Sequence, residues 1–257
     1  MHCQGPSCYV KAVLGALFTP PVSPYILASL KHTDHETDTQ KQLRDDITDL
    51  IYSLSGGSMF DATAIKNNGA LSTGFHDNFA NNEQHSAISY LQCILNALGV
   101  LDREDAISKV TRVAYREGTA DVNELFIGFV KRSVFMVASA GMVYEQQPRT
   151  SLERLLLNVH QVTRLDKHNA IVDKDGVQWT TMHETVQLRE APMLILVVER
   201  PIGARLELDV PATIGRLVLR SVLFYTGNGV SGHWSFAIID NSANKSAIQR
   251  GSAFVYS

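Results

Sequence analysis

The chain has 257 residues, of which 45% are hydrophobic and 19% are charged, so it is long enough to bury a sizeable core. Its formal net charge of −3 gives no basic surface for nucleic acid or anionic lipid. Apolar runs stay well below the ~20 residues that a membrane-spanning helix needs, and the opening "MHCQGPS" lacks the pattern of a signal peptide. We therefore expect neither a nucleic-acid partner nor a membrane partner.

The spacing of the cysteines and histidines argues against disulfide bonds and metal sites. Cys3, Cys8 and Cys93 are too few for a disulfide framework, and no two of them have the Cys-x-x-Cys spacing of a zinc site. The nine histidines show no His-x-x-x-His spacing. We expect no metal and no cofactor, and free thiols in a reducing compartment, either cytoplasm or nucleus.

The first half of the chain has helical periodicity. Residues 10–18 carry apolar side chains at helical spacing before Pro20 and Pro21 end the pattern, and 38–54 shows a second apolar stripe. Gly, Asn and Ser dominate 55–81, which predicts mostly loop. A third helix is predicted over 83–99, closed by Gly99.

The second half has strand patterns. Apolar or alternating runs predict strands at 193–200 and 205–210, and a long hairpin formed by 215–225 and 233–240. Asp175-Gly176 marks a further turn. Helices followed by strands indicate an α+β fold in one domain over 1–257, with a helical part at about 1–130 and a β-rich part at 131–257.

Cys8 lies where a helix begins, directly after Gly5-Pro6-Ser7. A helix N-terminus stabilises a thiolate through its dipole and its unpaired N–H groups. A nucleophilic thiolate also needs a base, usually a histidine that the fold brings to it. The alternative is a structural role, since cysteine is among the most buried residue types.

His233 is the histidine best placed to be that base. It follows the Gly-rich stretch "TGNGVSG" and begins a strand whose other residues are mainly apolar. Such a position holds the imidazole rigidly at the edge of a cleft. The alternative is an ordinary turn histidine.

Four segments, taken in order, resemble the ubiquitin-specific proteases. "GPSCYVKAVLGALF" (5–18) resembles the cysteine box of that family, and "QHSAISYLQCILNAL" (84–98) resembles its second motif. "APMLILVVER" (191–200), followed by "LELDVP", is similar to its strand pair. "VLRSVLFYTGNGVSGHWSFAIID" (218–240) resembles its histidine box, and "SAFVY" (252–256) its last strand.

The resemblance implies a papain-like fold with a helical, thumb-like N-terminal half and an antiparallel β palm in the C-terminal half. It implies a thiol protease in which Cys8 is the nucleophile and His233 the base, with Gln84 and Gly232 in substrate binding. The implied substrate is ubiquitin or a ubiquitin-like modifier, cleaved after its C-terminal glycine.

The sequence departs from the family pattern at several positions. Cys3 stands where the family has an asparagine that helps to hold the oxyanion, so main-chain N–H groups around Ser7 and Cys8 should contribute most, with Gln4 the nearest side-chain donor. Ser86 and Ser89 replace the acidic residues of the second motif. Such divergence, together with the compact length, favours a viral or otherwise fast-evolving enzyme, or one domain of a larger protein.

The third catalytic residue stays open. Asp240 lies seven residues after His233, which is roughly 23 Å along an extended strand and too far to orient the imidazole. Asn241 and Asn244 read as turn residues, and a tight turn there would place Ser252 opposite His233. A Cys-His dyad without a third member is the remaining alternative.

Three functions fit these observations. The first is a cysteine isopeptidase that removes ubiquitin or a ubiquitin-like modifier. The second is a catalytically weak scaffold of the same fold that binds ubiquitin or another protein. The third is a papain-like protease that processes a viral polyprotein.

Overall fold

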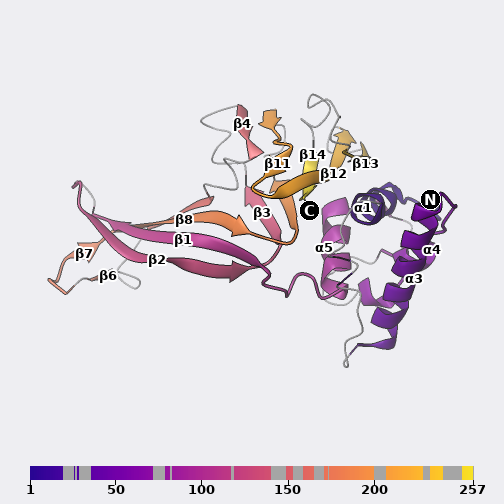
Figure 1. The fold of residues 1–257 in the computed structure, drawn as a ribbon, viewed down its shortest axis with the longest axis horizontal. Helices are drawn as coiled ribbons and strands as arrows, with labels where there is room; N and C mark the ends of the chain where they lie inside the picture. Colours follow the sequence, from indigo (N-terminus) through magenta and orange to yellow (C-terminus); the bar gives the residue numbers. More distant parts are fainter. Residues whose placement is uncertain are drawn as a thin grey trace.

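A computed structural model describes most of the chain: residues 1–19, 26, 28, 36–71, 79–81, 83–116, 119–139, 149–152, 159–164, 171–172, 174–199, 207–227, 232–239 and 251–256. Its helices are α1 (Cys8–Phe18), α3 (Asp38–Ser55), α4 (Thr63–Lys66) and α5 (Ala87–Ala97), with the 3-10 turn η1 (Gly69–Leu71). The elements form a helical region at one end, a central sheet and a projecting β arm at the other end (Figure 1).

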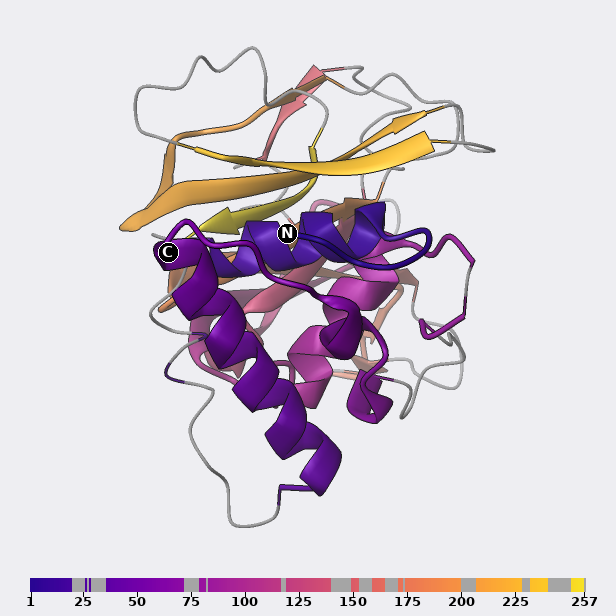
Figure 2. The same ribbon diagram turned by 90° about the vertical axis from the view of Figure 1, so that its right-hand side faces the viewer.

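The helical region is built around α1. This helix is apolar on nearly every side because it lies between the central sheet and the other helices (Figure 2). The helix α3 is amphipathic and starts with a capping box, in which Thr37 and Gln40 satisfy each other's main-chain N–H groups. Ser86 caps α5 by accepting a hydrogen bond from Ile88 N.

The central sheet is assembled from the C-terminal half of the chain. Its strand order is β11-β12-β14-β9-β3, and β13 pairs with β12. The strands are β3 (Phe135–Ser139), β9 (Leu194–Glu199), β11 (Thr213–Ile214), β12 (Leu217–Gly227), β13 (Gly232–Ile238) and β14 (Gly251–Tyr256). Pairing is antiparallel except between β3 and β9, which are parallel.

Both faces of this sheet are buried. Along β9, Ile195 and Val197 face the core that contains α1, α3 and α5, whereas Leu194 and Leu196 face a second, smaller core. The near-continuous apolar run in this strand follows from burial on both faces. The second core also receives Leu208 from β10 (Glu207–Asp209), which pairs in parallel with β4 (Arg149–Ser151).

The arm, which we define as β1, β2, β5 and β8, is a four-stranded antiparallel sheet of order β2-β1-β8-β5. Its strands are β1 (Ala106–Tyr115), β2 (Val122–Arg132), β5 (Val159–Arg164) and β8 (Thr181–Glu190). Near its tip, β6 (Ile171–Val172) and β7 (Gln178–Trp179) form a short hairpin (Figure 1). Gly176, in the turn predicted at Asp175-Gly176, has a φ of 79°, which glycine adopts without strain.

Most predicted elements are present with shifted ends. The helices over residues 10–18 and 38–54 and the hairpin of β12 and β13 are confirmed, and α5 begins at Ala87 instead of near 83. The predicted loop over 55–81 contains α4 and η1. The structure is α+β, since helices precede the strands in the chain.

Two predictions about the halves need correction. The boundary at about residue 130 is too late, because β1 and nearly all of β2 lie within the segment expected to be helical. The central sheet is mixed instead of antiparallel throughout, because β3 joins its edge in parallel with β9. Among the described residues, no helix is both long and apolar enough to cross a membrane.

Candidate active site

Cys8 is the first residue of α1, and its side chain is partly exposed. Gly5, at the start of the preceding turn, has a φ of 70°, a backbone conformation that favours glycine. Ser7 occupies the N-cap position, but its side chain makes no cap hydrogen bond to the first turn. The helix therefore begins with the positive end of its dipole beside the thiol and without a side-chain cap.

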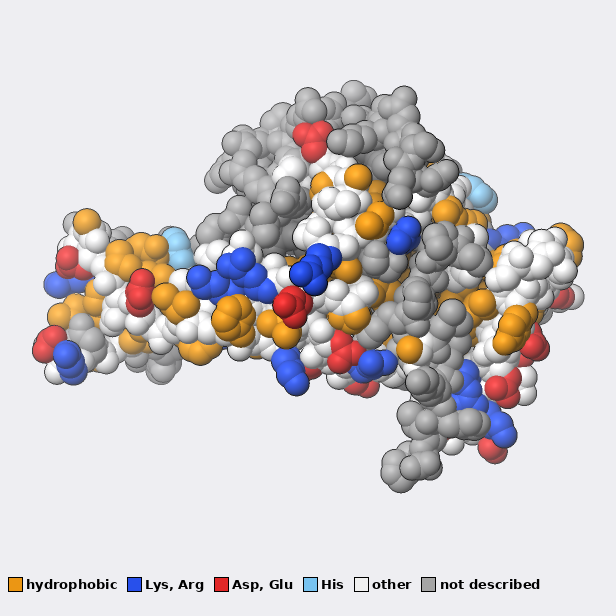
Figure 3. Space-filling view, in the orientation of Figure 1, with side chains coloured by type: hydrophobic (Ala, Val, Ile, Leu, Met, Phe, Trp, Pro, Cys, Tyr) orange, Lys and Arg blue, Asp and Glu red, His pale blue; other side chains and the backbone are white. Residues whose placement is uncertain are grey.

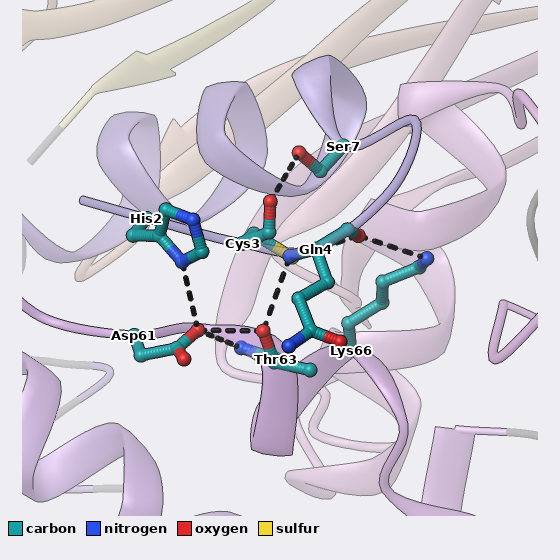
Figure 4. Close-up of polar contacts among 7 residues, drawn as sticks. All are labelled: His2, Cys3, Gln4, Ser7, Asp61, Thr63 and Lys66. Carbon is teal, nitrogen blue, oxygen red and sulfur yellow. Dashed lines mark hydrogen bonds and ion pairs between the residues drawn. The ribbon is translucent and has the colours of Figure 1, made fainter.

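The segment that leads to Cys8 is pinned to residues 60–63. His2 N donates to Phe60 O at 2.8 Å, and Ala62 N donates to His2 O at 2.8 Å. Gln4 N donates to Thr63 Oγ1 at 3.1 Å (Figure 4). These bonds join residues far apart in sequence, so they fix the direction from which the chain enters α1.

Cys3 lies inside this pinned segment and is 6% exposed. Burial raises the pKa of the Cys3 thiol, and the Lys66 ammonium and the hydroxyls of Ser7 and Thr63 oppose part of that rise. The thiol faces Gln4 O, with 3.9 Å between sulfur and oxygen. Cys3 is thus a buried thiol turned toward the backbone.

Gln84 brings two distant parts of the chain together at Cys8. Its side-chain Nε2 donates to Gly232 O at 3.0 Å and lies 3.8 Å from Cys8 Sγ, at hydrogen-bond distance for sulfur. The three residues come from the start of α1, the segment before α5 and the start of β13. Three of the four residues that the sequence pointed to therefore meet at one place.

Gly232 can only be glycine in this arrangement. A Cβ atom at this position would lie 2.2 Å from the Tyr225 ring and 2.7 Å from the main-chain Thr226 O. The Tyr225 ring also packs on Trp234, with 5.1 Å between ring centroids. A side chain here would therefore shift the residue whose carbonyl accepts from Gln84.

His233 follows Gly232, and its side chain is exposed. On β13, the Phe236 ring lies against Gly15 of α1, and Trp234 packs on the core that contains α1. Successive strand residues point to opposite faces. His233 therefore lies on the face of β13 turned away from α1, and among the described residues no hydrogen bond joins its ring to Cys8.

The described part of the chain does not place the third catalytic residue that the family resemblance implies. Asp240, Asn241 and Asn244 lie outside the described residues. Ser252 belongs to β14, and the expectation that it lies opposite His233 is wrong, because β12 separates β13 from β14. The partner of His233 in the sheet is Thr226.

An aromatic cluster beside the site was not predicted, although Tyr9 and Tyr90 lie in the two segments that resemble the family's motifs. Tyr9, directly after Cys8, packs on Phe79, His85 and Tyr90 with centroid distances of 5.4 to 6.0 Å. Tyr9 Oη also donates to Phe79 O at 3.5 Å. Through this cluster, the segment that carries Gln84 packs against the start of α1.

Lys66 and Asn81 are two further residues that sequence reasoning missed. Lys66 is 3% exposed, and its ammonium donates to main-chain carbonyls of Gln4 and Asn81. Lys66 and Asn81 lie in the region 55–81, which the sequence predicts to be mostly loop and where no periodicity marks either residue. Within the described residues, no three His, Cys, Asp or Glu side chains gather as a metal site would require.

Comparison with known proteins identifies a fold. No family model and no curated protein matches the sequence. A chain in the solved structure "SAGA DUB module Ubp8/Sgf11/Sus1/Sgf73 bound to monoubiquitin" matches 100% of this chain and 68% of its own length, with a TM-score of 0.63 and 12% identity. The fold is like that of a ubiquitin protease. At this identity, the likeness concerns the fold alone.

Proposed function

We propose that this chain is a thiol-dependent isopeptidase that cleaves after the C-terminal glycine of ubiquitin or a ubiquitin-like modifier. One observation carries the proposal: Cys8, at a helix N-terminus, lies beside the Gln84 amide, which also donates to the Gly232 carbonyl, on a ubiquitin-protease-like fold. A helix N-terminus stabilises a thiolate, and a fixed amide donor beside it suits acyl transfer.

The proposed reaction has two stages. Cys8 Sγ attacks the carbonyl carbon of the terminal glycine and gives up its proton. The family resemblance assigns the accepting base to His233, so the proposal requires this imidazole to turn from the outer face of β13 toward the thiol. The bond to the lysine nitrogen then breaks, His233 returns the proton to the leaving amine, and a thioester to Cys8 remains. Water hydrolyses the thioester and releases the carboxylate and the free thiol.

The proposed substrate is a folded modifier with a slender glycine tail. Gly5 lies in the turn before Cys8, and Gly232 O accepts from the Gln84 amide beside the thiol; neither glycine has a side chain that would block an extended peptide. The exposed arm offers a separate surface for the body of the modifier. We further propose a reducing compartment, cytoplasm or nucleus, where Cys3, Cys8 and Cys93 stay free.

The second candidate is a scaffold of the same fold that binds ubiquitin without cleaving it. The position of His233 on the face of β13 away from α1 favours this alternative, because a base must reach the thiol proton. Under this alternative, Cys8 and His233 would have no chemical connection.

Turnover of a ubiquitin–lysine isopeptide substrate decides between the candidates. We expect the wild type to release ubiquitin, Cys8→Ala to be inactive and His233→Gln to lose roughly 100-fold or more in kcat. Cys93→Ala, at a buried position on α5, is the matched cysteine control and should retain activity. Ubiquitin binding by a wild type that never releases product would favour the scaffold.

A further inference from the structure

We infer that Gln84 supplies a side-chain oxyanion donor to the reaction at Cys8 and that Lys66 and Asn81 position it. This inference rests on the proposed function, since an oxyanion forms only if Cys8 attacks a carbonyl. It assigns a role in the chemical step to an amide that would otherwise only contact substrate.

The orientation of the Gln84 amide is set by its neighbours. Gly232 O can only accept, so the amide nitrogen and not its oxygen must face it. The same NH₂ group lies 3.8 Å from Cys8 Sγ. A carbonyl carbon bonded to Sγ would carry its oxygen into the space beside this nitrogen, where a second N–H is available.

The other side chains near Cys8 are poorer donors. The Cys3 thiol is buried and turned toward Gln4 O, and a thiol is only a weak donor. Ser7 Oγ donates to Cys3 O at 3.2 Å (Figure 4). The side-chain amide that contacts Cys8 Sγ belongs to Gln84 and not to Gln4.

Asn81 orders the residues on both sides of Gln84. Its Oδ1 accepts from Glu83 N at 3.0 Å and lies 2.7 Å from a ring nitrogen of His85. Its Nδ2 donates to a Glu83 carboxylate oxygen at 3.0 Å. These bonds hold Glu83 and His85 in place. Gln84 lies between them, so its backbone position is fixed from both sides.

Lys66 connects this segment to the one that leads to Cys8. Its Nζ donates to Gln4 O at 3.4 Å and to Asn81 O at 3.2 Å, and its side chain comes from α4, against which the Gln4 segment lies (Figure 4). A single buried ammonium thus fixes the distance between the segments of the nucleophile and the donor. Lys66 is a positioning residue and does not touch the thiol.

The first test uses Gln84→Ala and Gln84→Glu on the ubiquitin–lysine isopeptide substrate. Gln84 is exposed, so both variants should fold. Loss of one oxyanion donor costs about 100- to 1000-fold in kcat. The isosteric Gln84→Glu replaces the donor by an acceptor, so it should be at least as slow as Gln84→Ala, while KM changes less than kcat.

The second test is a double-mutant cycle with Lys66→Met. We expect the single variant to lose about 100-fold in kcat, since a misplaced donor is costly. If Lys66 acts through Gln84, the variant Lys66→Met with Gln84→Ala should be no slower than Gln84→Ala alone. The control Lys41→Met removes an exposed lysine of α3 and should be neutral. Hydrogen exchange at residues 79–86 should rise in Lys66→Met only.

The outcomes separate the inference from the function. Cys8-dependent cleavage at an unchanged kcat in Gln84→Ala and Gln84→Glu would overturn the donor role and leave the isopeptidase intact. Losses that add in the double variant would overturn the positioning role of Lys66. A wild type without Cys8-dependent cleavage would overturn both the inference and the proposed function.

Discussion

The helical region around Cys8 and the arm differ in how much side-chain surface they bury and in the polar contacts that order them. Around Cys8, single polar contacts join residues far apart in sequence, such as Gln84 with Gly232 and Lys66 with Gln4. In the arm, neighbouring strands pair along their length, and large apolar side chains face solvent. Hydrophobic, basic and acidic side chains are intermixed over its visible face (Figure 3).

The difference shows where this chain needs a fixed geometry. A contact at Cys8 has one partner in one orientation. Under the proposed function, losing such a contact shifts a reacting group by a fraction of an ångström, which is enough to slow the reaction. The arm depends on many similar pairings, and Ile127 and Phe129, at 52% and 70% exposure, lie free for contact. The following predictions test this contrast.

The largest expected effect comes from truncating one apolar residue in each region. Leu14 is completely buried in α1, so Leu14→Ala should lower the free energy of unfolding by about 3–5 kcal/mol. Phe129→Ala in the arm should change it by no more than about 0.5 kcal/mol. Denaturant titration measures both, and equal losses would abolish the contrast.

A glycine substitution tests the strand approach beside Cys8. Gly232→Ala forces a Cβ onto the main-chain Thr226 O, so the carbonyl that holds Gln84 must shift. We expect about a 100-fold lower turnover of the isopeptide substrate. The control Gly56→Ala meets no atom closer than 3.4 Å at the end of α3, and its turnover should equal that of the wild type.

An ion-pair variant tests the independence of the arm. The Glu184 carboxylate is 13% exposed and pairs with Arg112 at 2.6 Å and Arg132 at 3.5 Å, which links three strands. Because both arginines are partly exposed and a glutamine oxygen can still accept from them, Glu184→Gln should cost about 0.5–1 kcal/mol of unfolding free energy. Hydrogen exchange should rise in the arm strands and stay unchanged at α1; a matching rise at α1 would show that the regions unfold together.

The smallest expected effect is a pH dependence from Cys3. Because burial raises the pKa of this thiol, the folded chain keeps the proton at a pH where the unfolded chain has lost it. Stability should therefore be complete below about pH 8.5 and fall as the pH rises above it. Cys3→Ala should flatten this slope in unfolding titrations between neutral and alkaline pH, and an unchanged slope would contradict the assignment.

Periodicity in the sequence predicts the helices α1 and α3 and the face of β13 on which His233 lies. Helical spacing in 10–18 and 38–54 marks α1 and α3, because each has one or more faces that must be buried. The apolar alternation of Trp234, Phe236 and Ile238 already places His233 on the opposite face of β13, a consequence of strand geometry that the family resemblance obscures.

Other features depend on contacts that no local pattern encodes. Lys66 stands in a short polar stretch whose composition indicates a loop, and only the fold brings its ammonium to Gln4 O and Asn81 O. The same holds for β14, which pairs with β12 and not with β13, so Ser252 is not opposite His233. Strand order is a long-range property that periodicity does not fix.

The central claim is that Cys8 is the nucleophile for a ubiquitin-like tail. Incubation with ubiquitin that bears a C-terminal electrophile, followed by mass spectrometry of the digested product, tests it directly. We expect one covalent adduct, on the Cys8 peptide, present in Cys93→Ala and absent from Cys8→Ala. An adduct that persists in Cys8→Ala, or a wild type that forms none, would contradict the claim.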